Sequence, residues 1–281
     1  MDNINFNIEE AVKMYNSGMS TIKIAKAFGF KTPKSISDKL KAHGISLRRN
    51  INGNSAKIKD YRDDIFETID CEWKAYYLGL LLTDGWITKH KNKSHYDVVG
   101  LSMTDEDAIS FISNCTGKSY TKIIGKEKVF PSGNTYYPKD QYRILLNSRK
   151  IVKDLKRLSV VPNKTNILSG PNLRYSELKY LNFIMRGIID GDGTFGFPSN
   201  SDESIYFRII SASEDFLIWC KDSLEILGMR NIRINKIKDR DNFYELYSGI
   251  KNNIDILVNT IYKDSFGMSR KRDLILSKYY K

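Results

Sequence analysis

The apolar positions of residues 7–49 recur with helical spacing in three short runs. The first run stops at Gly18 and the second at Gly29, and glycine is the residue type that most often follows the last turn of a helix. A third run begins at Pro33, which fits the first turn of a helix, and stops at Gly44. The pattern therefore predicts a compact three-helix domain in this part of the chain.

The outward face of the third predicted helix is polar and basic, with side chains of Lys34, Ser35, Ser37 and Lys39. A helix, a short turn and a basic final helix resemble the helix-turn-helix module, whose last helix enters the major groove of DNA. The resemblance implies that these four side chains contact DNA and that residues 1–49 form a DNA-binding domain. A three-helix domain that binds a protein, or nothing, stays open as the alternative, because three short helices are a common arrangement.

Residues 50–69 are polar and basic and are predicted to form a linker. Five basic residues lie in it or directly before it, namely Arg48, Arg49, Lys57, Lys59 and Arg62. They fit a strap that follows a DNA groove, as basic arms do in other binders, and they fit a solvated connector equally well.

From residue 70 onward the sequence repeats itself. The first copy opens with an apolar helix that ends at Asp84, and the second with one that ends at Asp192, 108 residues later. Strands and amphipathic helices follow in the same order in both copies. They are predicted over 73–82, 98–102, 105–113, 142–146 and 149–158 in the first half (70–172), and over 178–189, 207–211, 214–227, 244–247 and 251–262 in the second half (173–281).

A glycine precedes each of the two aspartates by five residues, Gly79 before Asp84 and Gly187 before Asp192. Glycine inside a helix costs about 1 kcal/mol relative to alanine, so matched glycines indicate a close approach of two backbones. We expect the two helices to pack on each other and to bring both carboxylates to one end of the pair. Neighbouring carboxylates repel, and a bound divalent cation such as Mg²⁺ relieves that repulsion.

The charge and the cysteines of the chain limit the class of binding partner and the cellular compartment that can be expected. The net charge of +12 and the isoelectric point of 9.4 indicate a polyanionic partner, with nucleic acid the first expectation. Residues 1–60 hold eleven Lys and Arg against five Asp and Glu, a net charge of +6. The three cysteines are far apart and form no zinc or disulfide pattern. With no signal peptide and no membrane-length apolar run, the sequence predicts a cytoplasmic protein that associates with the nucleoid through DNA.

Two segments carry a family resemblance, YLGLLLTDG at residues 77–85 and MRGIIDGDG at residues 185–193. They resemble the two LAGLIDADG motifs of a single-chain homing endonuclease, and the resemblance covers residues 70–281. It implies an α+β fold in which two αββαββα halves are related by pseudo-two-fold symmetry. The motif helices would form the interface, the curved sheets would straddle DNA as a saddle, and the helix-turn-helix domain would precede this saddle.

The resemblance also implies a site-specific double-stranded DNA endonuclease of the kind linked to intron or intein mobility. Such a protein acts as a monomer on DNA, with no membrane and no obligate protein partner. Asp84 and Asp192 would bind the catalytic metal, Mg²⁺ with Mn²⁺ as a substitute, and the carbonyl groups of Thr83 and Gly191 would assist.

Basic residues near the scissile phosphates are also implied, and two lysines lie at matched offsets. Lys164 follows Asp84 by 80 residues, and Lys271 follows Asp192 by 79 residues. We expect both lysines to be catalytic, by stabilising developing charge or by tuning the attacking water.

Recognition of the DNA sequence is expected on the sheets, where alternating side chains face the major groove. The candidates are Lys91, Lys93, Tyr142, Arg143, Arg208, Arg233, Lys236, Lys238, Arg240 and Tyr244. Because strand side chains alternate, about half of such residues face away from DNA.

The two copies also differ. One motif position is Leu82 in the first copy and Asp190 in the second, and a strand position that can organise water is matched as Gly100 with Ile209. Unequal cleavage of the two DNA strands is therefore possible.

Two other functions use the same scaffold. A transcriptional regulator can keep the saddle and a helix-turn-helix without cleaving DNA, although the two intact aspartates argue against it. An RNA-splicing maturase is the second alternative, which the DNA-type amino-terminal domain disfavours and which stronger binding to RNA than to duplex DNA would favour.

Overall fold

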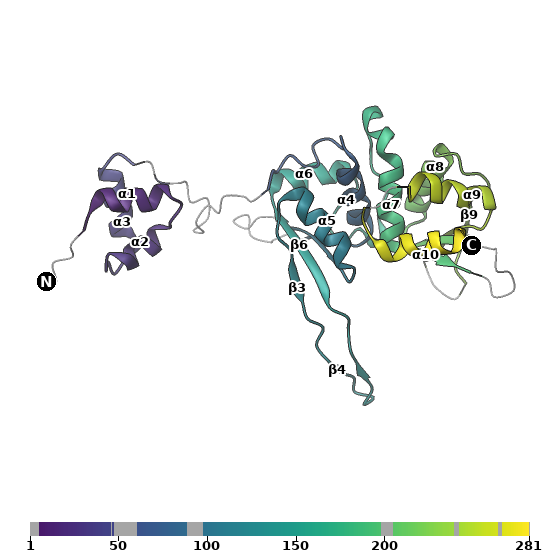
Figure 1. Cartoon of the computed structure of the whole chain (residues 1–281), viewed down its shortest axis with the longest axis horizontal. Helices are drawn as coiled ribbons and strands as arrows, with labels where there is room; N and C mark the ends of the chain where they lie inside the picture. The colour runs from purple at the N-terminus through teal and green to yellow at the C-terminus, as the bar shows by residue number, and fades with distance from the viewer. Residues whose placement is uncertain are drawn as a thin grey trace. The chain divides into compact units, whose positions relative to one another are not determined.

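The structure, a computed structural model, describes residues 6–45, 47, 61–88, 98–197, 205–238, 242–263 and 266–280 (Figure 1). The chain divides into two compact units, residues 1–59 and residues 60–281. Each unit has an apolar core of its own. Among the described helices, none combines the length and the apolar character needed to cross a membrane.

The first unit contains three helices, α1 (Ile8–Asn16), α2 (Thr21–Ala27) and α3 (Pro33–Ala42). The hydroxyl of Ser20 caps α2 by accepting the backbone N–H of Lys23 at 3.3 Å. Apolar side chains from all three helices are fully buried against one another, among them Ala11, Ile24, Ile36 and Leu40. The predicted three-helix arrangement and the starts of α2 and α3 are confirmed.

The second unit contains two halves that share a common order of helix, two strands, helix, two strands and helix, with further elements in each half. The first half is built from α4 (Glu72–Thr83), β1 (Gly85–Thr88), β2 (Val98–Met103), α5 (Glu106–Thr116), β3 (Thr121–Ile123), β4 (Lys128–Val129), β5 (Thr135–Tyr136), β6 (Gln141–Asn147), α6 (Arg149–Arg157) and η1 (Lys164–Asn166). The second half is built from η2 (Tyr175–Tyr180), α7 (Leu181–Asp192), β7 (Gly193–Gly196), β8 (Tyr206–Ser211), α8 (Glu214–Ile226), β9 (Arg233–Lys236), β10 (Tyr244–Ser248), α9 (Lys251–Ile256), η3 (Leu257–Ile261) and α10 (Ser269–Tyr279).

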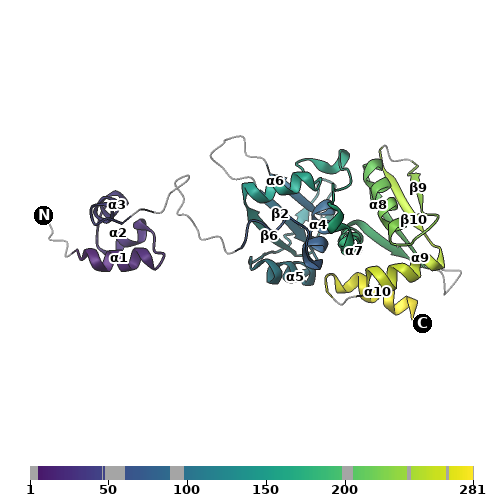
Figure 2. The same cartoon turned by 90° about the horizontal axis from the view of Figure 1, so that it is seen from above.

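Each half forms one four-stranded antiparallel sheet with the same strand order. The order is β1-β2-β6-β3 in the first half and β7-β8-β10-β9 in the second. The motif helices α4 and α7 lie side by side between the two sheets, which is clearest from above (Figure 2). The predicted duplication is therefore confirmed as a repeated topology.

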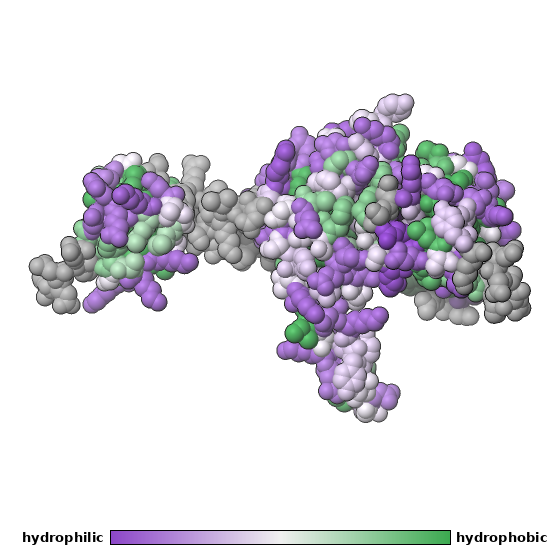
Figure 3. All heavy atoms as spheres, in the orientation of Figure 1, coloured by the Kyte–Doolittle hydropathy of each residue, from purple (hydrophilic) through white to green (hydrophobic). Residues whose placement is uncertain are grey.

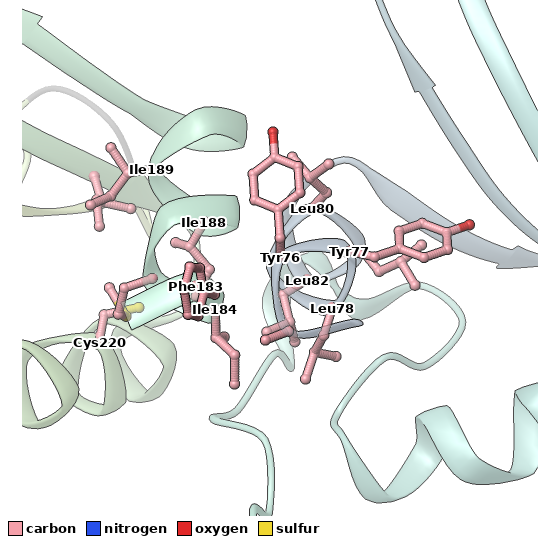
Figure 4. Packing of buried hydrophobic residues seen from close by; sticks show 14 of the residues in the cluster. Tyr76, Tyr77, Leu78, Leu80, Leu82, Phe183, Ile184, Ile188, Ile189 and Cys220 are labelled. Carbon is pink, nitrogen blue, oxygen red and sulfur yellow. The ribbon is translucent and has the colours of Figure 1, made fainter. Parts of the chain in front are cut away.

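The two motif helices are buried along most of their length. Residues 75–82 of α4 are all buried, as are residues 183–190 of α7. A helix that is apolar on every side must be surrounded by protein, and here each helix packs on its own sheet and on the other helix. Figure 4 shows the side chains of this core, with Tyr76, Leu80 and Leu82 projecting from α4 and Ile184 and Ile188 from α7.

Gly79 and Gly187 lie where the motif helices meet. A Cβ atom added to Gly79 would be 2.3 Å from the carbonyl oxygen of Ile184, and one added to Gly187 would be 2.3 Å from that of Tyr76. Both distances are shorter than any real Cβ contact, so only glycine allows the backbones to approach this closely. The close approach predicted from the matched glycines is confirmed.

Several segments differ from the predicted elements, and the helix α10 was not predicted. Residues Tyr175–Tyr180 form a 3₁₀ helix, so α7 begins at Leu181 and not at residue 178. The helix predicted over 251–262 changes at Leu257 from α to π geometry. Between β3 and β6 the chain extends into a long hairpin with β4 and β5 near its end, an element that the sequence pattern did not predict (Figure 1).

Candidate active site and nucleic-acid interface

The carboxyl ends of α4 and α7 lie together at one end of the helix pair. Asp84 caps α4, and Asp192 is the last residue of α7. A Cβ atom on Gly191 would be 2.7 Å from Oδ2 of Asp84, so the carboxyl group of the first half lies against the backbone of the second. The structure thus brings the two predicted metal ligands to one place.

Burial raises the pKa of both aspartates, although each residue as a whole is exposed at its helix end. The pKa of Asp192 is raised to about 6, first by burial of its carboxyl group and then by the negative charge of Asp84. The Thr83 hydroxyl, 3.3 Å from Oδ2 of Asp84, partly offsets the effect of burial on Asp84. Two carboxyl groups in this environment favour a bound cation.

Lys164 and Lys271 occupy matching places beside the two aspartates. The Nζ of Lys164 donates hydrogen bonds to the carbonyl oxygens of Thr83 at 2.8 Å and Gly85 at 2.7 Å. The Nζ of Lys271 donates to the corresponding carbonyls of Gly191 at 3.2 Å and Gly193 at 2.6 Å. The matched offsets in the sequence therefore correspond to matched positions at the ends of α4 and α7.

The two lysines satisfy carbonyl groups that the end of a helix leaves without partners, and this is a structural role in its own right. Burial lowers the pKa of both ammonium groups. The charges of Asp192 and Asp84 oppose this effect at Lys164, while Asp190 is the first to oppose it at Lys271. Each half thus places one carboxylate and one partly desolvated ammonium group at the same end of the helix pair.

The donor set is suited to a hard divalent cation that keeps part of its hydration shell. Within the described residues no group of three or more His, Cys, Asp and Glu side chains surrounds one point. Mg²⁺ needs no such cage, because one or two carboxylates with water and substrate phosphate oxygens are its usual ligands. The carbonyl oxygens of Thr83 and Gly191, predicted to assist, already accept hydrogen bonds from the lysines.

The predicted DNA-reading residues divide between the two faces of the sheets. Arg143, Arg208 and Arg233 alternate with the core residues of β6, β8 and β9, and so lie on the open faces. Tyr142 and Tyr244 lie on the opposite faces, where they pack against the core, and Lys236 pairs with Tyr244 at the exposed end of β9. The alternation expected from strand geometry therefore separates the three arginines from these three residues.

The predicted match of Gly100 with Ile209 is wrong by one residue. Gly85 pairs with Leu101 and Gly193 pairs with Ile209, which makes buried Leu101 the counterpart of Ile209. The counterpart of Gly100 is therefore Arg208. A β-strand pattern alone leaves the register undetermined by one residue, so it does not separate a core position from an open-face position.

Several open-face residues were missed by the sequence reasoning. Trp86 lies directly opposite Gly100, where a Cβ atom would be 2.3 Å from its indole ring. The guanidinium group of Arg143 lies over the same ring, 5.5 Å from its centroid. Tyr247 pairs with Arg208 on the other sheet. Pairing of aromatic residues with arginine across strands was the available signal, but it depends on a register that one sequence does not reveal.

The remaining candidates lie in the first unit, in a turn, or outside the described residues. On α3, Lys34 is exposed, Ser35 and Ser37 are half-buried, and the Nζ of Lys39 lies 4.9 Å from the ring centroid of Phe6. Lys238 is exposed after β9. The candidates outside the described residues are Arg48, Arg49, Lys57, Lys59, Lys91, Lys93 and Arg240.

No known protein-family profile and no curated protein sequence matches the chain. Among solved structures, the homing endonuclease I-WcaI bound to its DNA recognition sequence is similar, with a TM-score of 0.52 over 78% of this chain and 91% of that chain at 16% identity. The chain has the LAGLIDADG homing-endonuclease fold.

Two other similar structures have lower TM-scores. They are I-DmoI in complex with DNA and Mn (TM-score 0.45, 17% identity, 71% of this chain and 100% of that chain) and full-length WhiA from Thermatoga maritima (TM-score 0.43, 15% identity, 78% of this chain and 65% of that chain). In this chain, the LAGLIDADG fold places Asp84, Asp192 and the two lysines at the end of its central helix pair.

Proposed function

We propose that the protein is a site-specific endonuclease that hydrolyses both strands of duplex DNA with a divalent metal at Asp84 and Asp192. One observation carries the proposal: two halves of a LAGLIDADG fold bring two carboxylates and two desolvated lysines to one end of the central helices. A purely structural role at the two helix ends would need only the lysines. The two aspartates are unfavourable there, because a negative charge at the carboxyl end of a helix opposes its dipole.

The proposed mechanism assigns a role to each of the four side chains. Asp84 and Asp192 would hold Mg²⁺ or Mn²⁺, and the bound metal would polarise the scissile phosphate and make a bound water more acidic. Lys164 and Lys271 would place positive charge where the phosphate gains negative charge, and the lowered pKa of each ammonium group favours transfer of its proton. One such set in each half supports a cut in each strand.

DNA would lie along the open faces of the two sheets. Arg143, Arg208 and Arg233 provide guanidinium groups that can pair with guanine edges or phosphates, and Trp86 and Tyr247 provide neighbouring aromatic rings. The helical unit would bind next to this site through α3 and raise the affinity by increasing the effective concentration. The protein would act as a monomer, because the two halves already supply both centres.

A Mg²⁺-dependent cleavage assay on a library of long duplexes tests the proposal. We expect specific double-strand breaks from the native protein and a fall of about a hundredfold or more in the cutting rate for Asp84→Asn and for Asp192→Asn. Asp222→Asn is the matched control, because Asp222 is an exposed aspartate of α8. It should cut like the native protein.

Other outcomes would assign a different function. Tight and specific binding to duplex DNA without cutting, in Mg²⁺ and in Mn²⁺, would indicate a regulator on this fold, which the separate helical unit also fits. Stronger binding to RNA than to duplex DNA would indicate a maturase.

A further inference from the structure

A polar cluster lies inside the interface between the motif helices. Its members are Tyr76 of α4, Arg186 and Asp190 of α7, and Tyr262, and each is at most 1% exposed. Both tyrosine hydroxyls donate to Asp190, that of Tyr76 to Oδ2 at 2.9 Å and that of Tyr262 to Oδ1 at 2.7 Å. A carboxylate at this depth needs such donors, so the cluster fixes the position of each member.

The same cluster holds the segment that leads into α10. The backbone N–H of Met268 donates to the hydroxyl oxygen of Tyr76 at 3.1 Å and to Oδ2 of Asp190 at 3.4 Å. Arg186 donates to the carbonyl oxygen of Phe266, and its guanidinium carbon lies 4.8 Å from the centroid of the Phe266 ring. Lys271 follows Met268 by three residues, within the first turn of α10.

The start of α10 is also tied to the first half of the protein. The backbone N–H of Ser269 donates to Oδ2 of Asp107 at 2.7 Å. The guanidinium of Arg270 binds both carboxylate oxygens of Asp105 at 2.8 and 3.0 Å. The backbone on the amino-terminal side of Lys271 is thus held by the buried cluster and by two carboxylates of the first half.

The matching position in the first half has different chemistry. Leu82 of α4 stands where α7 has Asp190, and an aliphatic side chain accepts no hydrogen bond. Lys164 lies on η1, a 3₁₀ helix of three residues, whereas Lys271 lies on an α-helix of eleven residues. The Nζ of Lys271 also reaches the carbonyl oxygens of Ile189 at 2.8 Å and Asp190 at 2.7 Å.

We propose that Tyr76 and Asp190 are positioning residues for Lys271, so that one of the two cleavage centres depends on the buried cluster and the other does not. The inference rests on the proposed nuclease function. The route runs from the Tyr76 hydroxyl through the N–H of Met268 to the first turn of α10. Four carbonyl oxygens lie within 3.2 Å of Lys271 Nζ and share its three N–H donors, so a small shift of that turn moves the ammonium group out of place.

The test measures the cutting rate of each strand of one duplex substrate, for the variants Tyr76→Phe and Tyr77→Phe. Tyr77 is the next residue of α4 and is also fully buried, yet within the described structure its hydroxyl has no hydrogen-bond partner. Tyr76→Phe should slow the cutting of one strand at least about tenfold more than that of the other. Nicked duplex should then accumulate, and its cut strand should be the one that the variant Lys271→Met still cuts. Tyr77→Phe should leave the ratio of the two rates unchanged.

Lys164→Met provides the opposite comparison, because it should slow the strand that Tyr76→Phe spares. Equal slowing of both strands by Tyr76→Phe, or slowing of the Lys164-dependent strand, would overturn the inference. If Tyr76→Phe does not fold, Tyr262→Phe removes the other tyrosine donor to Asp190 and should change the same strand.

A readout without cleavage separates this inference from the proposed function. Backbone amides of α10 should exchange with solvent about tenfold faster in Tyr76→Phe than in Tyr77→Phe, while the amides of α8 exchange equally in both. A native protein that cuts no DNA but shows this difference would contradict only the nuclease function. Equal exchange of α10 in the two variants would contradict the positioning role.

Discussion

At the scale of residues, the pair Asp84 and Asp192 stores unfavourable charge that a cation can neutralise. The pKa of Asp192 is raised from its ordinary value of 3.8 to about 6, by burial and then by Asp84. The unfolded chain loses this proton near pH 4 and the folded protein near pH 6. Stability therefore falls as pH rises between these values, and the loss persists at neutral pH.

Asp192→Asn should therefore melt at a higher temperature than the native protein at pH 8 in the absence of divalent metal. The difference should shrink as the pH falls through about 6, because the native carboxyl group then also becomes neutral. Thermal melts across pH 5 to 8 measure this. Added Mg²⁺ should raise the melting temperature of the native protein more than that of the variant.

Asp105→Asn is a control of opposite sign. The Arg270 guanidinium lowers the pKa of Asp105, so its charged form stabilises the fold and the variant should melt lower at pH 8. If the native protein and Asp192→Asn melt at the same temperature at every pH, then ionisation of Asp192 does not destabilise the fold.

At the scale of elements, the central feature is a pair of helices joined at two glycines. Gly187→Ala should destabilise the protein by about 3 kcal/mol, because the added methyl group would meet the Tyr76 carbonyl at 2.3 Å and force α4 and α7 apart. Urea unfolding measures the change. Gly249→Ala is the control, since its nearest neighbour would be the flexible end of a tyrosine side chain at 3.1 Å. A loss below about 1 kcal/mol for Gly187→Ala would contradict this account of the interface.

The motif helices and the strands differ in how far the sequence predicts them. The motif helices were predictable, because an apolar helix with matched glycines and a terminal aspartate occurs twice, and the repeat also located Lys164 and Lys271. The register of the strands was not, and Arg208 rather than Ile209 proved to correspond to Gly100. Strand patterns repeat every two residues, so a shift by one is resolved only by the pairing itself.

The hairpin between β3 and β6 was missed for another physical reason. Its side chains mix lysines with exposed apolar and aromatic residues, so they show neither a buried face nor a helical period. Much of its surface is hydrophilic or intermediate in hydropathy (Figure 3). The base of the hairpin is held by two contacts of Asp140. Its Oδ1 accepts the backbone N–H of Gly125 at 2.9 Å, and its carboxylate pairs with Lys122 at 2.9 Å.

The chain joins a basic helical unit to a fold that already contains both proposed centres. Residues 1–60 carry +6 of the net charge of +12, so this part of the chain should add to the attraction for phosphate groups. If the helical unit binds DNA beside the cleavage site, it contributes to the affinity for DNA and to the choice of target. It does not contribute to the hydrolysis itself. The two contributions can be separated, because the centres lie entirely in residues 60–281.

Removal of residues 1–59 should therefore weaken DNA binding about a hundredfold and flatten its dependence on salt, while the cutting rate at saturating protein changes little. Titrations at several salt concentrations and single-turnover cleavage measure the two quantities. Within the full chain, Lys34→Ala on α3 should lower the salt slope by about one, because it removes one phosphate contact. Lys13→Ala changes an exposed lysine of α1 instead and should leave the slope unchanged. Equal slopes for the truncated and full-length proteins would mean that the helical unit binds something other than this DNA.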